Sequence, residues 1–249
     1  MAEDPRFWVA LGTSGIALAG TIYTSIVGYR GQQKLARLNA ELQEDREDRQ
    51  AKLESRKVVS KYRDPLMHAA YDLQSRIFNI LRRDFLTRYY ANGSPREKDY
   101  AVENTVFLVA QFLGWTEAVR QEIQFLDLDE NDQTRRLRQL QDAIFTQLQT
   151  DTLGTGFRLF AGEQRAVGEL MIDRTASACR CIGFAAFTNS RNPAIDRWLD
   201  PLRDDVKQMA VQRGQFEDRL VCIQHSMIDL LEFLDPGFVR FPQSNRGKV

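Results

Sequence analysis

The hydrophobic and polar residues of this chain change their pattern twice along its length. The first pattern is a run of 23 residues without a charge, from Phe7 to Tyr29 (FWVALGTSGIALAGTIYTSIVGY). A helix of that length rises about 34 Å at about 1.5 Å per residue, enough to cross a hydrocarbon core about 30 Å thick. The run therefore predicts one transmembrane helix over residues 7–29, after a short N-terminal tail at residues 1–6.

Two alternatives to a membrane helix are a cleaved signal peptide and a buried core helix. Ala17-Leu18-Ala19 resembles a cleavage site, but the start MAEDPR carries two acids against one arginine, whereas a signal peptide begins with a basic region. The uncharged run also continues for ten residues past Ala19. A core helix of a soluble fold rarely runs this far without a charge. The sequence therefore favours the membrane helix over both alternatives.

The residues that flank the run predict its orientation. Three basic residues follow it before the first acid, and a single arginine precedes it. By the positive-inside rule, this asymmetry puts the N-terminus outside and the C-terminal domain in the cytoplasm. Aromatic rings near both ends are expected at the bilayer surface, and the basic residues suit anionic headgroups. The predicted membrane-interface residues are Trp8, Tyr29, Arg30, Lys34 and Arg37.

One face of the predicted membrane helix carries small residues at intervals of four. Small side chains at this spacing let two membrane helices approach closely, so the sequence is compatible with a homo-oligomer joined at this face. The residues predicted for helix–helix association are Gly12, Gly20, Thr24 and Gly28, with Ile16 in the same row.

The second pattern is a charged segment that predicts a helical stalk over residues 30–63. Between Glu41 and Lys57, 11 of 17 residues are charged, and neither proline nor glycine occurs from 32 to 63. Acids stand four residues before bases, the order that stabilises a helix. Leu35, Leu38 and Leu42 fit one heptad, which is too short to establish a coiled coil, so pairing of the stalk is left open.

The third pattern is helical periodicity, which predicts a globular domain over residues 64–241 and a flexible tail over 242–249. Asp64-Pro65 and Ser94-Pro95-Arg96-Glu97 have the chemistry of helix starts. The stretch Val106–Trp115 is apolar nearly all round, which predicts the central helix of a core. Sustained alternation of period two is almost absent. The predicted fold class is therefore all-α, with the membrane helix continuing into the stalk and then a compact bundle of about six or seven helices.

Overall charge and cysteine content exclude some classes of partner. Lysine plus arginine and aspartate plus glutamate each number 34, so we expect no nucleic-acid partner. Three cysteines, two of them one residue apart, make a poor disulfide framework. Free thiols fit a reducing compartment, in agreement with a cytoplasmic C-terminal domain.

Candidate chemistry in the sequence is weak. Cys179, Cys181, Cys222 and His225 form a zinc-compatible set, but residues two apart on a helix point about 200° apart and the usual short ligand spacing is missing. The pairs His68/Asp72 and His225/Asp229 lie roughly opposite the apolar stripes of their helices, as solvated faces do. We assign no catalytic residue, metal or cofactor, and the sequence favours a protein that is not an enzyme.

Three functions remain in order of preference. The first is a single-pass membrane-anchored protein that presents a cytoplasmic all-α domain for protein interaction, as a scaffold, adaptor or signalling module, with the lipid bilayer and another protein as partners. The second is a membrane-tethered enzyme or small-ligand sensor with a pocket between distal helices, involving His225, Cys222 or the Glu163–Glu169 stretch. The third is a membrane-active oligomer assembled through the anchor helix.

Overall fold

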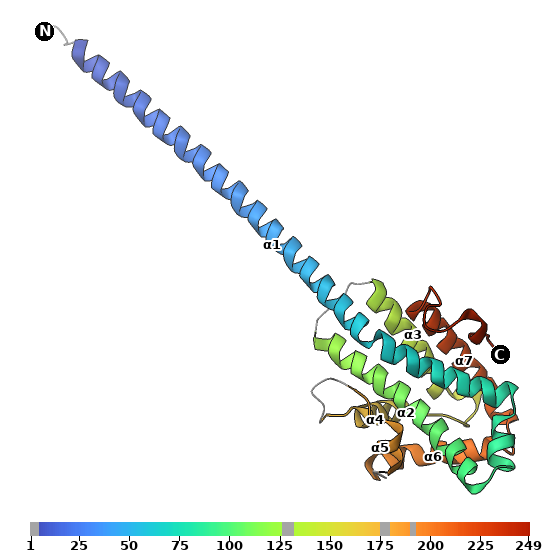
Figure 1. Ribbon diagram of the computed structural model, residues 1–249. Coiled ribbons are helices and arrows are strands. Elements are labelled where there is room, and N and C mark those ends of the chain that lie inside the picture. The colour runs from blue at the N-terminus through green and yellow to red at the C-terminus, as the bar shows by residue number, and fades with distance from the viewer. Residues whose placement is uncertain (1–4, 126–131, 175–179, 190–192) are drawn as a thin grey trace. The chain divides into compact units, whose positions relative to one another are not determined.

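The structure is a computed structural model that describes residues 5–125, 132–174, 180–189 and 193–249, without the side chains of residues 5–31, 51–52, 54–56, 58–60 and 122–125. The chain divides into two units, Met1–Leu53 and Glu54–Val249. The helix α1 (Pro5–Arg82) contributes to both, and all later helices belong to the second unit (Figure 1).

The second unit is built from helices. After α1 come the π-helical turn η1 (Thr87–Ala91), α2 (Pro95–Phe125), α3 (Asp132–Gln149), the 3-10 turn η2 (Asp151–Leu153), α4 (Ala161–Met171), α5 (Phe184–Asn189), α6 (Pro193–Met209), α7 (Gly214–Leu234) and the 3-10 turn η3 (Gln243–Asn245). Over the described ranges the chain forms no strand, and its one isolated β-bridge joins Ile172 to Cys181. The predicted all-α fold class is confirmed.

The membrane prediction concerns residues of which only the backbone is described. Among the helices open to inspection, none is both long and apolar enough to cross a bilayer. The run 7–29 lies in α1, but its side chains fall outside the described residues. The transmembrane helix, the interface residues Trp8, Tyr29 and Arg30 and the small-residue face therefore stay predictions.

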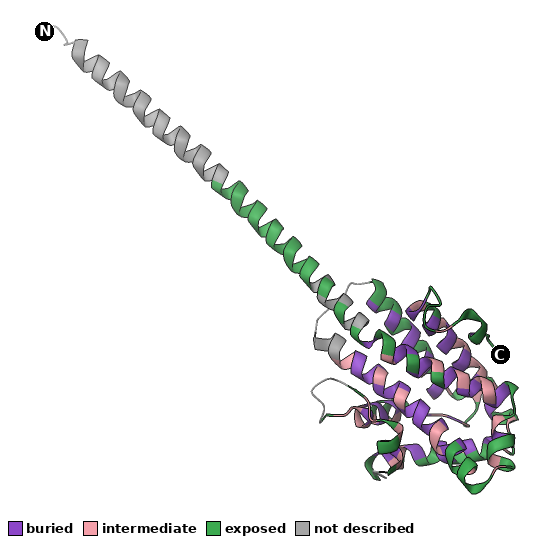
Figure 2. Cartoon of the chain, viewed as in Figure 1, coloured by how far each residue is buried: buried purple, intermediate pink, exposed green. Residues whose placement is uncertain are grey.

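The described part of the first unit is a helical segment with exposed side chains. Residues 32–50 are exposed throughout, including Lys34 and Arg37 (Figure 2). Leu35, Leu38 and Leu42 expose 61%, 51% and 46% of their surface in this single chain. The helical state of the predicted stalk is thus observed here, whereas its pairing into a coiled coil stays a prediction.

The helix α2 lies at the centre of the second unit, as its apolar circumference predicted. Residues 105–110 and 112–114 are buried, and α2 packs against α4, α5 and α6 (Figure 2). Its other side meets α1, where the rings of Tyr62 and Trp115 have centroids 6.4 Å apart. Because both sides of α2 are covered, the apolar residues around its whole circumference are shielded from water.

Two glycines let α2 and α4 approach closely. A Cβ atom on Gly114 would come within 2.7 Å of the Cβ of Met171 and 2.8 Å of the Sγ of Cys181. A Cβ atom on Gly168 would lie 2.9 Å from the Leu113 carbonyl oxygen. All three distances are shorter than the contacts that real Cβ atoms make, so this crossing requires glycine on each helix.

The expectation that Asp64-Pro65 begins a helix is wrong, because Pro65 lies inside α1. A proline inside a helix removes one hydrogen bond and costs about 3 kcal/mol. Tyr62 and Leu66, on either side of Pro65, expose only 2% and 1% of their surface. Their burial offsets that cost and keeps the helix continuous. Pro201 likewise lies inside α6 rather than at a break, whereas Pro193 does begin that helix.

The residues predicted to face inward on the other helices are largely buried. Leu137, Leu140, Ile144 and Leu148 of α3 are buried, as are Phe216, Leu220, Ile223, Met227 and Leu231 of α7. In α5, Phe187 is buried, but Ala185 and Ala186 are exposed because this short helix covers the core with one side only.

The chain end after Pro242 packs on the helices, although the sequence predicted a loose tail. Arg246 exposes 5% of its surface and donates hydrogen bonds to the carbonyl oxygens of Leu231 (3.2 Å), Asp235 (2.9 Å) and Phe241 (2.6 Å). It also forms an ion pair with the Asp235 carboxylate. These bonds to the end of α7 and to the residues that follow it hold the chain end in place.

Candidate functional site

A cleft of about 780 Å³ opens where the end of α1, the turn η1 and the start of α2 meet. We call it the arginine cleft, because arginines are its most frequent lining residue. Its walls are made by Arg76, Asn79, Arg83, Phe85, Arg88, Tyr89, Ser94, Arg96, Glu97 and Tyr100. All of these residues belong to one stretch of 25 positions in the second unit.

A sharp turn after α1 brings the walls of the cleft together. Asp84 has φ of 51°, the left-handed conformation that ends a helix. Arg213 holds this turn, since its Nη1 lies 3.4 Å from the carbonyl oxygens of Ile80 and Leu81 and 3.3 Å from the Asp84 carboxylate. A guanidinium at this position satisfies carbonyl groups that the end of a helix leaves free.

The turn η1 presents Arg88 and Tyr89 to the cleft. Its π-helical bonding is seen where the N–H of Asn92 donates to the carbonyl of Thr87 at 3.1 Å. Such wide turns are rare and occur frequently at functional sites, because they redirect side chains that a regular helix would place elsewhere. Neither an apolar period nor a cap in the sequence indicates this turn.

The start of α2 forms the opposite wall, and its predicted cap is present. The Ser94 N–H and hydroxyl both donate to Oε2 of Glu97, at 2.8 Å and 2.7 Å. These two bonds lower the pKa of Glu97, so it is ionised at neutral pH. The reach of Glu97 back to Ser94 agrees with the predicted capping box, although the serine hydroxyl donates here rather than accepting.

Arg76 forms the buried side of the cleft. It exposes 8% of its surface, and its guanidinium carbon lies 3.9 Å from the centroid of the Phe85 ring. Its Nη2 donates to Oδ1 of Asn104 at 2.6 Å, and its Nη1 to the Thr105 hydroxyl at 3.4 Å. Burial lowers the pKa of the Arg76 guanidinium and outweighs the opposite effect of Tyr100. The guanidinium is still a cation, since arginine does not lose its proton in proteins.

Two of the three other buried arginines of the described residues pair with carboxylates, and the third, Arg219, is fully buried, whereas Arg76 has no carboxylate partner and lines a cleft. Arg203 forms ion pairs with Glu103, Asp196 and Asp200, at 2.8 to 3.1 Å. Arg246 pairs with Asp235, and Arg219 donates to four backbone carbonyl groups. Arg76 has only neutral partners, and no described carboxylate lies within ion-pair distance of it. A buried cation without a counter-ion is costly, so this site is suited to an added anion.

Three further arginines add to the positive charge of the cleft. Arg83, Arg88 and Arg96 are exposed, and within the described structure none of them pairs with a carboxylate. Counted with Arg76 and Glu97, the lining residues carry a formal charge of +3. Guanidinium groups present paired N–H donors that match the oxygens of carboxylates and phosphates. The cleft can therefore hold an anion.

The lining favours binding over catalysis. Glu97 is its one carboxylate and is already engaged by Ser94, and no histidine or cysteine is among the described lining residues. Tyr89 and Tyr100 are the other lining groups that can transfer a proton to or from a bound molecule. Arginine, tyrosine and asparagine fix the position of a ligand by hydrogen bonds and stacking.

The weak metal candidates do not form a site in the described part of the chain. Cys181 lies in the β-bridge with Ile172 beside Gly114, whereas Cys222 and His225 lie on α7. Nowhere in that part do three histidine, cysteine, aspartate or glutamate side chains converge as metal ligands would. Cys179 lies outside the described residues.

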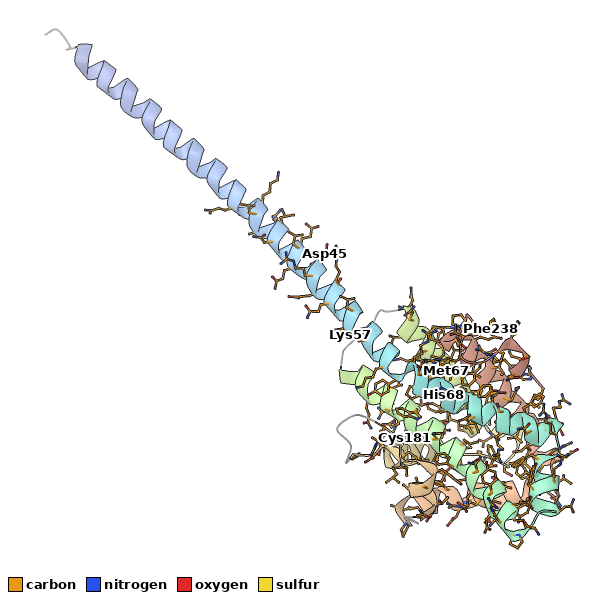
Figure 3. All side chains as sticks on the ribbon, in the orientation of Figure 1. Asp45, Lys57, Met67, His68, Cys181 and Phe238 are labelled. Carbon is orange, nitrogen blue, oxygen red and sulfur yellow. The ribbon has the colours of Figure 1, made fainter. Side chains whose placement is uncertain are left out.

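The two histidines have structural contacts instead. His68 is exposed, follows the buried Met67 along α1, and meets the Phe241 ring edge to face at 5.0 Å (Figure 3). Nε2 of His225 lies 2.9 Å from the Val249 carbonyl oxygen. Asp229, its predicted neighbour, pairs with Lys248 at 2.6 Å. The polar face of α7 thus holds the chain end.

The Glu163–Glu169 stretch also has a structural function. Glu163 accepts a hydrogen bond from the Phe160 N–H at 2.8 Å, which caps the start of α4. Arg165 is exposed on the same helix. Gln164 of the same stretch lines a smaller hollow of about 270 Å³ between α2, α3 and α4, so a functional pocket at this stretch stays a prediction.

Sequence reasoning missed the arginine cleft, although a trace of it is present. The stretch from 82 to 100 (RRDFLTRYYANGSPREKDY) holds five basic and four aromatic residues. Such interleaving is typical of sites for anionic ligands with rings, but it extends over a turn whose geometry the sequence does not reveal.

Comparison with known proteins gives no further guide to this site. The chain matches no protein-family model, no curated protein and no solved structure. The evidence for function is therefore the lining and charge of the arginine cleft.

Proposed function

We propose that this chain is a membrane-anchored recognition protein whose helical unit binds a small anionic ligand in the arginine cleft. This is the ligand-sensor alternative, and it rests on one observation. The buried Arg76 is held in place by Phe85, Asn104 and Thr105 but has no carboxylate partner among the described residues. A bound anion would supply the missing counter-ion.

The proposed anchor rests on the sequence. Residues 7–29 would span the bilayer, with residues 30–63 as a charged helical stalk and the helical unit on the cytoplasmic side. The described part of the stalk is helical and exposed, which suits a spacer in water. A chain lacking residues 1–30 should leave the membrane fraction, and its retention there would contradict the anchor.

The protein-interaction domain stays a prediction from architecture alone. The ligand-sensor alternative is supported instead by the concave, basic and aromatic lining of the arginine cleft. Assembly through Gly12, Gly20, Thr24 and Gly28 of the anchor is a separate prediction that does not conflict with ligand binding.

Thermal unfolding of the full chain in a nonionic detergent tests the proposal with inorganic pyrophosphate as the probe. A ligand at a hundred times its Kd stabilises the folded state by about 2.7 kcal/mol. We expect a rise in Tm for the wild type that is lost when Arg88→Glu and Arg96→Glu are combined.

The matched control is Arg165→Glu, which makes the same charge change at an exposed position on α4 outside the cleft. It should respond to pyrophosphate as the wild type does. Absence of any response in the wild type at millimolar probe would overturn the proposal, and so would an equal loss in the control.

A further inference from the structure

Resting on the proposed function, we infer that the ligand of the arginine cleft carries both a phosphoryl group and a planar ring, as nucleoside phosphates do. The inference depends on the lining of the cleft, where guanidinium groups and aromatic rings alternate. The two kinds of side chain recognise different parts of a ligand.

The phosphoryl part follows from the arginines. Guanidinium groups form two parallel N–H···O bonds with a tetrahedral oxyanion, and four of them surround this cleft. The start of α2 also faces the cleft, but Ser94 there already donates to Glu97. The arginines, rather than this helix end, must therefore hold the anion, with Arg76 at the buried side.

The ring part follows from two tyrosines whose surfaces are still available. Tyr100 is 49% exposed and Tyr89 is 36% exposed, although both line the cleft. Tyr100 is kept in position by an edge contact with Phe184, with centroids 6.3 Å apart. Arg76 lies over both rings, but it is closer to the Phe85 ring, at 3.9 Å, than to the Tyr100 ring, at 5.6 Å, so Phe85 is the less available of the two. Tyr100 is therefore the platform on which we place a ligand ring.

The size of the cleft supports a ligand with both parts. Small-molecule sites typically measure about 300–1,000 Å³, and this cleft, at about 780 Å³, lies well inside that range. A lone phosphate would fill only a small part of it. Asn79 adds an amide that can both donate to and accept from the edge of a ring or a sugar.

Calorimetric titration of the full chain in nonionic detergent with EDTA tests the inference. Four probes separate the ligand parts: ADP has both, pyrophosphate has only the anion, adenosine has only the ring, and inositol trisphosphate is a phosphorylated lipid headgroup without a planar ring. We expect ADP to bind at least about tenfold more tightly than pyrophosphate or inositol trisphosphate, the contribution of one stacked ring. We expect at least about a tenfold advantage over adenosine as well, the contribution of charge-assisted hydrogen bonds to the phosphates.

The ring platform has its own variants. Tyr100→Ala should lower ADP affinity about tenfold more than pyrophosphate affinity and so remove the advantage of ADP, whereas Tyr100→Phe keeps the ring and should preserve that advantage. Equal binding of ADP and either pyrophosphate or inositol trisphosphate would overturn the inference and leave the anion site standing. Equal binding of adenosine and ADP, or no binding of any probe, would overturn both the inference and the proposed function.

Discussion

The guanidinium of Arg76 stacks on the ring of Phe85, with its central carbon 3.9 Å from the ring centroid. The contact joins a residue of α1 to the turn that follows it, and both line the arginine cleft. Stacking keeps the cation in one orientation without neutralising it. Arg76 is therefore fixed in position and can bind an anion, since no described carboxylate pairs with it.

This arrangement predicts an unusual result for Arg76→Met. Methionine has similar length and no charge, so it removes a buried cation that lacks a counter-ion. Removing an unpaired buried charge also removes its desolvation cost, which offsets the lost hydrogen bonds to Asn104 and Thr105. We expect the free energy of unfolding without ligand to stay equal or to rise, while pyrophosphate affinity falls more than tenfold.

Arg203→Met is the matched comparison, because Arg203 is buried and pairs with three carboxylates. Its removal leaves those carboxylates uncompensated and should cost about 3–5 kcal/mol. Urea titration measures the free energy of unfolding of both variants. If Arg76→Met lowered stability as much as Arg203→Met, Arg76 would be a structural residue and the functional assignment would fail.

The buried pair of Asp235 and Arg246 predicts acid sensitivity. Burial alone raises the pKa of Asp235, but hydrogen bonds from the N–H groups of Val239, Phe241 and Arg240 and from Arg246 outweigh it, so the pKa lies below its ordinary value. A lowered pKa stabilises the fold above the pKa of the unfolded state, about 3.9. That stability is lost as the pH falls through the lowered value.

Asp235→Asn should therefore cost about 3–5 kcal/mol at pH 7 and lose little more on acidification. Denaturant midpoints at pH 7, 5, 4 and 3 measure both effects. Asp64→Asn serves as the control, since Asp64 pairs with Arg240 at an exposed position and such pairs contribute about 0–1 kcal/mol. Parallel pH profiles for wild type and Asp235→Asn would refute this account.

Arg219 predicts the largest loss of stability from a single position. Its side chain is fully buried and donates to the carbonyl oxygens of Gly156 at 2.9 Å, Thr150 at 2.8 Å and Gly154 at 2.7 Å, and also to that of Gln147. Each carbonyl left without a donor costs about 1–3 kcal/mol.

Arg219→Met should then lower the free energy of unfolding by about 4 kcal/mol or more, and Arg219→Lys by less, because lysine keeps the charge but cannot reach four acceptors. Chemical denaturation followed by circular dichroism measures the change. Arg165→Met, at an exposed site, should stay within about 0.5 kcal/mol of the wild type. A similar small effect at Arg219 would contradict this account.

The exposed leucines of the stalk predict pairing with a second copy. Leu38 is 51% exposed between Leu35 and Leu42, and a parallel pair would bring the two copies of position 38 together. Leu38→Cys should form a disulfide-linked dimer under mild oxidation that the wild type and Asn39→Cys do not form. Equal cross-linking at positions 38 and 39 would show that the stalk does not pair in this register.

Much of the fold could be predicted because its information is local. The inward faces of α3 and α7 follow from apolar residues spaced along one helix, and the cap at Ser94 lies within four residues. The helix start predicted at Asp64-Pro65 from local sequence was wrong, because burial of Tyr62 and Leu66 outweighs the cost of the proline. The contacts of the chain end are not local either, because Arg246 depends on partners up to 15 residues earlier.

The site could not be predicted, because it depends on a turn. Arg76 and Asn104 are 28 residues apart and meet only because α1 and α2 run side by side (Figure 1). The left-handed conformation of Asp84 and the π-helical bonding of η1 then direct Arg88 and Tyr89 into the same space. The predicted membrane anchor is the converse case, since that prediction rests on the length and hydropathy of residues 7–29 alone.

Hydrogen exchange in the presence of pyrophosphate is the sharpest test of anion binding in the arginine cleft, because it locates binding as well as detecting it. On the full chain in nonionic detergent, the account predicts slower amide exchange in peptides from residues 76–100, no change in α3 or α7, and no effect in Arg76→Met. Unchanged exchange in residues 76–100 of the wild type, or equal protection in Arg76→Met, would contradict it.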